Sequence, residues 1–448
     1  MTSCLGIFRS VWFTLLQDLG SRRFLDPAHG VTLHDRSTDE LIASVKRILA
    51  GPATWSPDPT SGGFTPAVSH EIVLHPTIRT GVGILNWENE AKLLPGGAHV
   101  LFKNWRILEC WSAAEDRLVW THQPHPTLVH ASVLEFAAEV VDGGDRLIVL
   151  ICERTYPQSI YARTNYIEIV ALDLHEGTSE LLAVTGAADT SYDNPFSYPV
   201  LSGDIAAVAI SERNQYLIIN WRTKCRFLLR CKPCPLCRLA LIPGYIIFTS
   251  PFLIGMQEIH VIDIDAVANH WASFDGINDL PDINTVLEDQ IPHILSQRIS
   301  LKGFSPLLDE LSFESHNQLS VHESPLQRGI YRIWMYVLHK DNTSDKSHTT
   351  LRSFQLAIPA SGRPTWCERS SAPALGHMLY PTITYSGHTQ VFDAYGSRNQ
   401  RVLPPVLAGA DGAGEVDIAD CRDNVDVVPY SGALTYSTHK CLIIKYFK

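Results

Sequence analysis

Four cysteines within thirteen residues are the sharpest candidate for chemistry in this chain. They are Cys225, Cys231, Cys234 and Cys237, in the segment CRFLLRCKPCPLC. The last three have the C-x2-C-x2-C spacing that can hold zinc or an iron–sulfur cluster. Such a site needs four thiolates that converge on a turn, whereas residues 225–229 have the composition of a strand. We therefore expect small buried cysteines here, and no metal.

Histidines and acids form two further groups. The segment HQPHPTLVH holds His122, His125 and His130, and its two prolines predict a connector with surface histidines rather than a metal cluster. An acidic stretch contains Asp411, Glu415, Asp417, Asp420, Asp423 and Asp426. It lacks the glycine that an EF-hand loop requires at its sixth position, so a solvated loop is expected.

No linear motif selects a nucleophile and its base. The glycines of GADGAG, at positions 409, 412 and 414, follow a proline pair and not a strand, which argues against a nucleotide-binding loop. The sequence has no G-x-S-x-G, P-loop or H-E-x-x-H motif. Trp87, Trp105, Trp111 and Trp120 crowd one region and are expected in the core. We assign no catalytic, cofactor-binding or metal-ligating residue, and expect no enzyme activity and no cofactor.

The composition restricts the class of protein. The chain has 448 residues, of which 45% are hydrophobic and 19% charged, and this excludes wholesale disorder. Its net charge of −11, without a basic block, argues against binding to nucleic acid. No apolar run approaches the about 20 residues of a membrane helix, and no signal peptide is indicated. We expect an intracellular protein, cytoplasmic or nuclear, with reduced thiols, that is a monomer on its own.

The first 55 residues have the periodicity of helices. The spacing of Val11, Trp12, Leu15, Leu16 and Leu19 predicts one amphipathic helix. Ser37 and Glu40 form a capping box that predicts the start of a second helix, and Gly51-Pro52 predicts its end. The apolar face of this second helix comprises Leu41, Val45 and Ile48. Two short helices are not stable alone in water, so they must dock on another part of the chain.

A short hairpin pattern recurs from Gly62 onward. An apolar pair is followed by a turn with glycine and then by an apolar strand, as in LLPGGAHVLF and VVDGGDRLIVL. The glycines at the matching turn are Gly97, Gly144, Gly203, Gly244, Gly387 and Gly432. Glycine adopts a positive φ there without a steric clash of Cβ. A further apolar strand lies downstream in most units, and each unit is predicted to contain three or four antiparallel strands.

Repeats of four short strands at intervals of about 40–50 residues are typical of a β-propeller. A seventh unit, between Phe304 and Leu356, has the strands but not the matching glycine turn. We therefore predict a mainly β, β-propeller-like fold of about seven blades, or six, with a short N-terminal helical segment. The domains are residues 1–55, which are helical, and 56–448, which form the propeller. Insertions are expected at 187–198, 276–297, 339–350 and 404–425.

Two structural alternatives concern the whole of this β region. The units lack the Gly-His…Trp-Asp signature, so the array is at most WD40-like, and two β-sandwich domains are the main rival. A propeller is usually closed by pairing a strand from one end of the chain with the sheet at the other end. The segment HEIVLH at 70–75 and the last strand, 441–447, are the candidates.

Several ordered segments resemble one protein family. They are SVWFTLLQDL at Ser10, LHDRSTDELIASVKRILAGPATWS at Leu33, KLLPGGAHVLFKNWRILECW at Lys92, YLIINWR at Tyr216 and PYSGALTYSTH at Pro429. These segments resemble the F-box proteins of basidiomycete fungi, over most of the chain. In that family an F-box precedes a helical linker and an irregular propeller-like domain. The segment at Ser10 resembles the end of an F-box, whose Leu-Pro turn and first two helices are not in this sequence.

The resemblance implies a function without bond chemistry. It indicates a non-enzymatic protein-interaction module, akin to the substrate-recognition subunit of an SCF-type ubiquitin ligase, whose protein target is unknown. An F-box binds the Skp1 adaptor, so either an upstream exon is missing from the gene model or this member does not dock on Skp1. The alternatives are a propeller scaffold or ligand-binding protein without a connection to ubiquitination, and a propeller enzyme whose site gathers residues from several blades.

Overall fold

A computed structural model describes most of the chain. The described residues are 2–26, 32–55, 66–79, 89–125, 131–155, 164–187, 195–210, 215–231, 238–253, 256–274, 284–300, 317–340, 347–374, 382–391, 400–403, 414–416 and 425–448. The chain forms two compact units. Unit 1 contains residues 1–121, 322–334 and 370–448, and unit 2 contains residues 122–321 and 335–369.

The N-terminal segment is helical, as the sequence predicts. It contains α1 (Thr2–Ser21), η1 (Leu33–Asp35), α2 (Thr38–Ala50) and η2 (Ala53–Trp55). The capping box is confirmed: the backbone N–H of Ser37 donates to Glu40 Oε2 at 2.6 Å, and the N–H of Glu40 donates to Ser37 Oγ at 3.3 Å. α2 ends at Ala50, and Gly51 follows with a φ of +82°. None of the described helices is both long and apolar enough to span a bilayer.

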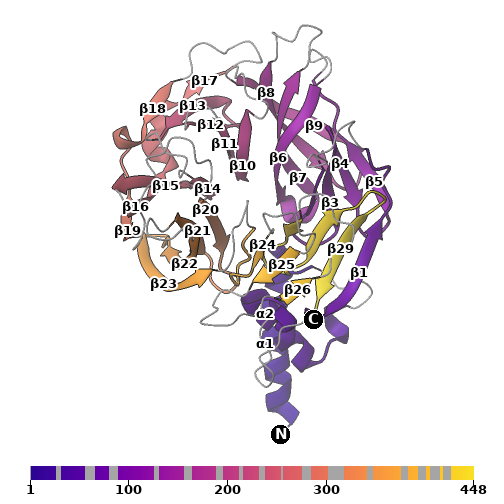
Figure 1. Cartoon of the computed structure of the whole chain (residues 1–448). Coiled ribbons are helices and arrows are strands. Elements are labelled where there is room, and N and C mark those ends of the chain that lie inside the picture. Colours follow the sequence, from indigo (N-terminus) through magenta and orange to yellow (C-terminus); the bar gives the residue numbers. More distant parts are fainter. Residues whose placement is uncertain are drawn as a thin grey trace. The chain divides into compact units, whose positions relative to one another are not determined.

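Small antiparallel sheets make up the rest of the described chain (Figure 1). Seven sheets are formed by the described strands. The first sheet contains β2 (Glu90–Leu93), β3 (His99–Asn104), β4 (Ile107–Ser112) and β5 (Arg117–Thr121). The second contains β6 (Ala131–Val141), β7 (Arg146–Thr155), β8 (Asn165–Asp173) and β9 (Ser179–Ala187). The third contains β10 (Phe196–Ser202), β11 (Ile205–Ile210), β12 (Gln215–Asn220) and β13 (Cys225–Arg230), together with β17 (Ala272–Ser273) and β18 (Thr285–Leu287).

The next three sheets follow along the chain. The fourth sheet contains β14 (Arg238–Ile242), β15 (Tyr245–Leu253), β16 (Met256–Asp263) and β19 (Leu295–Ser300). The fifth contains β20 (Asn317–Glu323), β21 (Ile330–Lys340), β22 (Ser347–Ala357) and β23 (Thr365–Ala374). The sixth contains β24 (Thr389–Val391), β25 (Gln400–Leu403) and β26 (Gly414–Val416). Short 3-10 helices connect strands at η3 (Asp142–Gly144), η4 (Ile264–His270) and η5 (Glu288–Gln290).

The seventh sheet joins the two ends of the sequence, and we call it the closing sheet. It contains β27 (Asp426–Val427), β28 (Leu434–Ser437) and β29 (Leu442–Phe447), and its fourth strand is β1 (Val68–Leu74). β1 pairs antiparallel with β29, with Ile72 opposite Ile444 (Figure 1, where purple β1 lies beside yellow β29). The pairing predicted for the first and last strands is confirmed. Five of the seven described sheets have four strands, and the last of these is completed by an N-terminal strand. Consecutive small sheets closed in this way have the topology of a β-propeller.

The recurring glycine turn is confirmed at all six predicted positions. Each of the six glycines has a positive φ, from +56° at Gly203 to +109° at Gly144. Five of them precede the second strand of their sheet, and Gly387 precedes β24, the first strand of its sheet. The expectation that the seventh unit lacks this turn is wrong. Gly329 has a φ of +71° and directly precedes β21, as in the other units. β20 ends in His322-Glu323 rather than in an apolar pair, and this concealed the match in the sequence.

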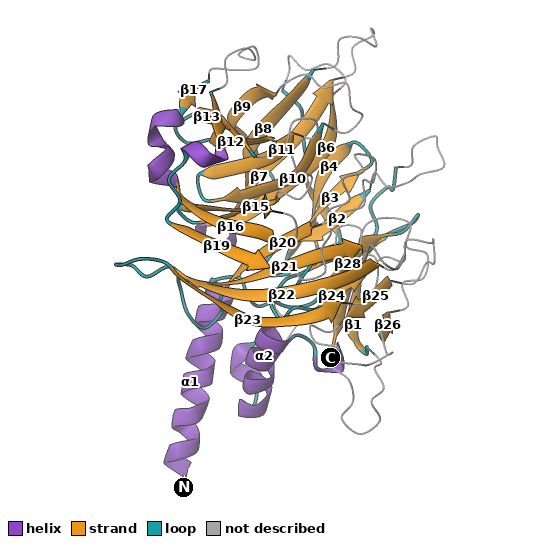
Figure 2. Ribbon diagram, turned by 60° about the vertical axis from the view of Figure 1, so that its left-hand side comes forward, coloured by secondary structure: helices purple, strands orange, loops and turns teal. Residues whose placement is uncertain are grey.

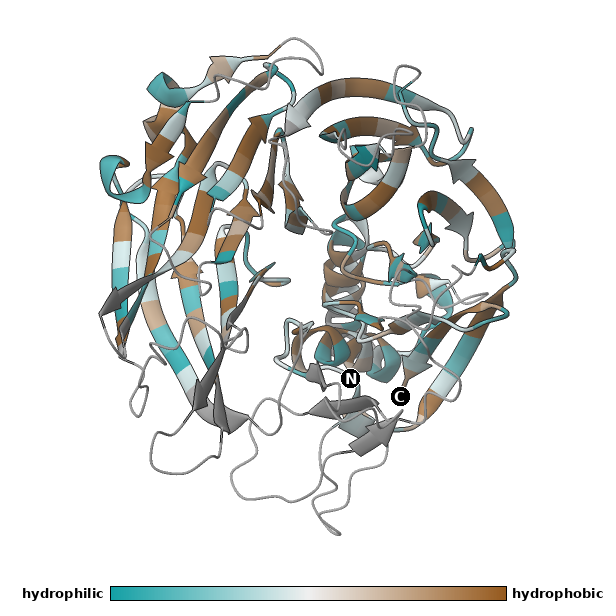
Figure 3. Cartoon of the chain, turned by 45° about the horizontal axis from the view of Figure 1, so that its top comes forward, coloured by the Kyte–Doolittle hydropathy of each residue, from teal (hydrophilic) through white to brown (hydrophobic). Residues whose placement is uncertain are grey.

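Apolar strands pack face to face within each unit (Figure 3). In unit 2, Ile169 of β8 and Leu217 of β12 belong to one core cluster, so the second and third sheets bury their facing sides together. In unit 1, Phe102 of β3 packs with Ile444 of β29. Nine of the ten residues of β7 are buried, which explains its continuous apolar run, since both faces of the strand are covered.

One predicted insertion connects neighbouring sheets of unit 2. Between β16 and β19 the chain forms β17 and β18, which both pair with β13 of the preceding sheet. β18 pairs in parallel, opposite Leu228 to Arg230. Of the other predicted insertions, residues 188–194, 341–346, 404–413 and 417–424 lie outside the described residues. The described remainder of 187–198 and 339–350 belongs mostly to β9, β10, β21 and β22, so these two insertions are shorter than predicted.

The closing sheet generates a prediction about stability. Deletion of residues 439–448 removes β29, and with it the strand that joins β1 to β28. The deletion exposes the apolar partners of Leu442, Ile444 and Phe447, each 0% exposed, and should lower the midpoint of thermal unfolding, measured by circular dichroism.

Two point variants separate this effect from that of shortening the chain. Ile444→Ala should lower the free energy of unfolding by about 2–5 kcal/mol, because Ile444 is fully buried. Val73→Ala on the partner strand, where Val73 is 37% exposed, should change it by less than about 1 kcal/mol. Unchanged melting of the deletion variant would contradict the importance of this sheet.

Candidate functional site

The helical segment packs its two helices on one another. Leu16 and Leu19 of α1 are fully buried against Leu41, Val45 and Ile48 of α2. The three residues of α2 are those that the periodicity predicts. Val11, which belongs to the predicted apolar face of α1, is 59% exposed. The C-terminal half of α1 therefore carries the packing, and Figures 1 and 2 show its N-terminal end pointing away from the sheets of unit 1.

Arg22, just after α1, attaches the helices to the β part of unit 1. Its guanidinium donates to the backbone oxygens of Pro325, at 2.8 Å, and Ser324, at 3.0 Å. It also lies 3.0 Å from the carboxylate of Glu323. The same guanidinium lies over the ring of Phe24, 4.5 Å from its centroid. A planar cation with this many acceptors fixes the orientation of the segment that it anchors.

The segment after α2 docks on the closing sheet. Trp55 is fully buried and contacts the rings of Phe447 and His388, with centroid distances of 5.2 and 5.3 Å. Thr54 bridges the adjacent ends of β1 and β29, since its hydroxyl donates to the Lys448 carbonyl and accepts from the Ala67 N–H, each at 3.1 Å. The helical segment is thus held by the strands that close the β part.

Two of the turn glycines make this docking possible. At Gly432, a Cβ would lie 2.9 Å from Pro52 Cδ and 3.0 Å from Trp55 Cη2. At Gly97, it would lie 2.9 Å from Asp26 Cβ. At Gly203 no atom lies within 4 Å of the same position. At Gly203, glycine is therefore needed only for the conformation of the turn. At Gly97 and Gly432, the missing side chain also allows the helical segment to approach closely.

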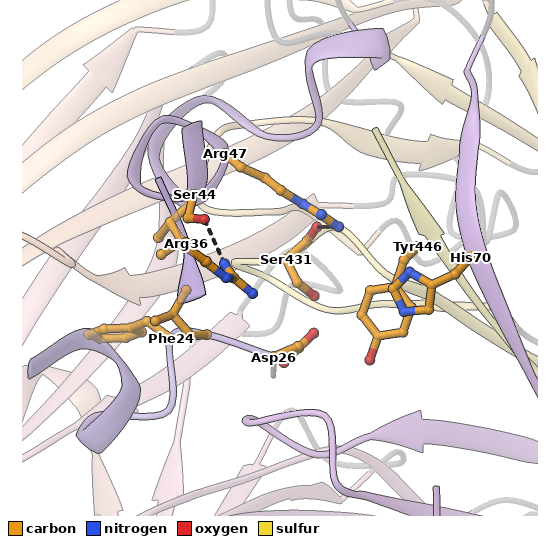
Figure 4. A pocket seen from close by; sticks show the side chains of 10 residues that line it. Phe24, Asp26, Arg36, Ser44, Arg47, His70, Ser431 and Tyr446 are labelled. Atoms are coloured by element: carbon orange, nitrogen blue, oxygen red, sulfur yellow. Dashed lines mark hydrogen bonds between the residues drawn. The ribbon is translucent and has the colours of Figure 1, made fainter. Parts of the chain in front are cut away.

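A small polar pocket lies where the helical segment meets the closing sheet (Figure 4). Its lining includes Asp26, Arg36, Arg47, Ser431 and Tyr446. Arg36 donates to Ser44 Oγ at 2.9 Å, and Arg47 donates to the Ser431 carbonyl at 3.4 Å. The pocket measures about 80 Å³, room for a few water molecules and far below the roughly 300 Å³ of the smallest usual ligand sites. Its geometry suits a polar joint between two parts of the chain.

Charges in this joint are desolvated. Burial raises the pKa of the Asp26 carboxyl to about 6, although hydrogen bonds from Ser431 and Gly96 and the charge of Arg47 oppose the rise. Burial also lowers the pKa of Arg47, and the Asp26 carboxylate counteracts it. Burial and the same carboxylate raise the pKa of Tyr446. Asp26 Oδ2 has no hydrogen-bond partner among the described residues.

A second polar group is buried in unit 2, and we call it the His122 cluster. His122 Nε2 lies 3.0 Å from Glu153 Oε1 and 3.8 Å from Glu168 Oε2. All three side chains are at most 2% exposed. The backbone N–H of His125 donates to Glu168 Oε1 at 2.9 Å. Burial raises the pKa of Glu168 to about 7, the Glu153 carboxylate raises it further, and His125 and His122 oppose the rise.

Strand register explains why these carboxylates meet. Glu153 of β7 pairs with Tyr166 of β8, so Glu168, two residues further along β8, projects from the same face. The sequence contained a signal that we did not use, because a lone glutamate inside an apolar strand stands in both RLIVLICERT and NYIEIVALD. A charged side chain at such a buried position needs specific polar partners within the protein, because it has no access to water.

The expectation that the histidine connector lies at the surface is wrong for one residue. His122 is buried, because the two glutamates offer acceptors inside unit 2 that solvent would otherwise supply. His125 contributes its backbone N–H, and His130 lies outside the described residues. The chain thus brings His122 to glutamates distant in sequence rather than to its neighbouring histidines.

The cysteine group does not form a site from its described members. Cys225 begins β13 and Cys231 directly follows the strand, so about 20 Å of extended chain separates them. Cys231 is 2% exposed and packs in the core, as expected of a small apolar residue. Cys234 and Cys237 lie outside the described residues.

The acidic stretch and the tryptophans have mixed outcomes. Asp426 does not lie in a solvated loop: it begins β27, and burial raises its pKa to about 6. Glu415 lies in β26, and the other four acids fall outside the described residues. Trp120 is 6% exposed and Trp111 packs against the core between the first and closing sheets, whereas Trp87 is not described.

Comparison with known proteins gives no family. Neither the protein-family models nor the curated proteins include a match to this chain. Among solved structures, the WD40 domain of SCAP from fission yeast has 6% identity and a TM-score of 0.38, with 80% of this chain and 84% of that one covered.

Two further solved structures are similar at the same low level. A eukaryotic initiation factor has 8% identity and a TM-score of 0.35, covering 84% of this chain and 90% of that one. A prolyl endopeptidase has 9% identity and a TM-score of 0.36, covering 78% of this chain and 46% of that one. Similarities this low assign no function to the chain.

Substitution at Gly432 tests the docking of the helical segment. Gly432→Ala should lower the free energy of unfolding by more than Gly203→Ala, since both residues have a positive φ but only Gly432 abuts Pro52 and Trp55. The conformational cost alone is about 1–2 kcal/mol and is common to both variants. Urea unfolding measures the difference, and equal losses would contradict close docking at Gly432.

Replacement of Asp26 tests the charge in the joint. A carboxyl whose folded pKa is about 6 and whose unfolded pKa is 3.8 binds more protons in the folded state, so its ionisation costs stability above pH 6, and that cost disappears as the pH falls toward 4. Asp26→Asn should therefore gain stability relative to the wild type between pH 4 and pH 7, by up to about 3 kcal/mol.

Urea unfolding across this pH range measures the gain. Asp39→Asn, at an exposed position in the first turn of α2, controls for the loss of a negative charge. If the difference in free energy of unfolding between Asp26→Asn and the wild type does not change with pH, burial does not destabilise the ionised form of Asp26.

Proposed function

We propose that this chain is a non-enzymatic protein-interaction module, related to the substrate-recognition subunits of SCF-type ubiquitin ligases. In this proposal the β part captures a protein target and the N-terminal helices contact the Skp1 adaptor. The chain would then promote ubiquitination by holding the target near a ubiquitin-transferring enzyme, without bond chemistry of its own. The resemblance of five ordered segments to basidiomycete F-box proteins supports this assignment.

The observation that carries the proposal is the one-sided anchoring of α1. Leu16 and Leu19 are fully buried on α2, and Arg22 binds the turn after β20, whereas Val11 is 59% exposed. A helix that is packed along its C-terminal half and exposes an apolar side chain near its middle is suited to extending a partner's interface. Rigid attachment to the closing sheet would also keep a captured target at a defined distance from the adaptor.

The exposed part of α1 also sets a requirement for the adaptor interface. Stable protein interfaces bury about 800 Å² on each partner, more than one turn of helix provides. The proposal therefore needs neighbouring residues of the helical segment, or sequence upstream of it, to contribute to the same surface. Such additional sequence would change the affinity for the adaptor, and the adaptor would still bind at α1.

A pull-down with immobilised Skp1 adaptor tests the proposal. The adaptor should retain the wild-type chain, and Val11→Glu should reduce retention by about 10-fold or more, since a charge in an apolar interface core is left unpaired. Leu118→Glu on β5 is the matched control, because Leu118 is also exposed, at 42%, but lies on a strand outside the helical segment.

Two results would contradict the proposal. If the adaptor retains neither this chain nor a form extended by upstream coding sequence, the ligase assignment is excluded. A propeller scaffold or ligand-binding protein without a connection to ubiquitination then remains. If Val11→Glu and Leu118→Glu are retained equally well, docking through α1 is excluded.

A further inference from the structure

The His122 cluster has the composition of a metal site. One imidazole nitrogen and two carboxylate oxygens, from three places in the sequence, lie within 4.8 Å of one another. The two glutamates lie on adjacent strands, β7 and β8, and His122 lies in the connector that precedes β6. Strands hold their side chains more rigidly than loops do, so two of the three donors are fixed by the sheet.

The distances fit a small divalent ion. Zn²⁺ binds imidazole nitrogen and carboxylate oxygen at about 2.0–2.2 Å, so two ligand atoms of a tetrahedral site lie roughly 3.4 Å apart. The distances from His122 Nε2 to Glu153 Oε1 and to Glu168 Oε2, 3.0 and 3.8 Å, lie on either side of that value. The oxygens of the two glutamates lie at most 4.8 Å apart, so a closer approach of the two carboxylates would place all three atoms around one ion.

One carboxylate oxygen in the cluster lacks a partner. Glu153 is 0% exposed, and its Oε2 atom has no hydrogen bond within the described part of the chain. An unpaired buried carboxylate oxygen is costly, because it loses its hydration without compensation. A cation held by both oxygens of the Glu153 carboxylate would satisfy this atom.

The charges of the cluster lead to the same ligand. With both glutamates ionised, a single imidazolium leaves one uncompensated negative charge in a buried place. A divalent cation neutralises both carboxylates and leaves the imidazole as a neutral donor. Glu168 is also oriented for this role, since the N–H of His125 holds its Oε1 at 2.9 Å and leaves Oε2 toward His122.

We propose that His122, Glu153 and Glu168 bind a divalent transition-metal ion of the class that prefers nitrogen and oxygen ligands, such as Zn²⁺ or Mn²⁺. The ion would fix the connector that carries His122 to β7 and β8. The site is structural in this proposal, and it is independent of the adaptor and target interactions described above.

Titration with Co²⁺ tests the site in the full chain. Co²⁺ occupies zinc sites and reports its ligands by its absorption spectrum, which matters because the sequence has ten cysteines. After removal of metals with a chelator, the wild-type chain should bind one Co²⁺ without the near-ultraviolet charge-transfer band of thiolate ligands. Mn²⁺, which has little affinity for thiolates, should compete for the same site.

Conservative variants identify the ligands. Glu153→Gln and Glu168→Gln preserve size and should each weaken Co²⁺ binding by about 100-fold or more, beyond the usual cost of losing an outer-sphere partner. Glu258→Gln is the matched control, since Glu258 is buried 3.5 Å from His260 in the same unit but belongs to no such cluster among the described residues. It should bind Co²⁺ as the wild type does.

Each outcome decides for or against the site. Wild-type binding that both glutamine variants lose, with unchanged circular dichroism, supports it. If a glutamine variant does not fold, a metal-dependent rise in the melting temperature of the wild type, reproduced by Mn²⁺, supports it instead. No binding by the wild type, a thiolate spectrum, or binding by Glu153→Gln and Glu168→Gln as strong as that of the wild type would overturn it.

Discussion

The pairing of β1 with β29 is the interaction on which the rest of unit 1 depends. It joins residues from opposite ends of a chain of 448 residues through a continuous register from Leu74–Leu442 to His70–Tyr446, with Val68 opposite Phe447 beyond a bulge. Each four-stranded sheet has apolar sides that it cannot cover alone. Leu74, Leu442 and Ile444 are fully buried against residues of the first sheet, so the pairing also completes the core between two sheets. The entropic cost of bringing such distant segments together is recovered only when this core forms.

The helical segment is attached to that same sheet. Trp55 packs on Phe447, Thr54 bonds to Lys448, and Gly432 provides the space for Pro52. Helices that are too short to fold alone thereby acquire a fixed position. A fixed helical segment on a β scaffold is the arrangement that a receptor subunit requires, and the proposed function rests on this link between local packing and geometry.

Local features of the structure could be predicted from the sequence. The capping box at Ser37, the helix end at Gly51 and the six glycine turns depend on neighbouring residues, and each formed as the spacing indicates. The apolar ends of the chain also predicted the strand pair, because a propeller topology restricts the possible partners. Gly329 was missed because the strand before its turn ends in His322-Glu323 instead of an apolar pair.

The polar groups could not be predicted in the same way. Asp26 meets Ser431 and Tyr446, and His122 meets Glu153 and Glu168, across 31 to more than 400 positions of sequence. Spacing along the chain favours nearby cysteines or histidines as partners, whereas the fold brings together residues on adjacent strands. Isolated charges inside apolar strands are the one sequence feature that marks such groups.

Amide hydrogen exchange of β1 and β29 tests the central role of the closing sheet most directly. If the pairing holds unit 1 together, the amides of β1 that donate to β29 and those of residues 442–446 in the sheet interior exchange only through global unfolding, with the same free energy and the same dependence on denaturant. Exchange of residues 70–74 at the rate of an open loop, while 442–446 stay protected, would contradict the account.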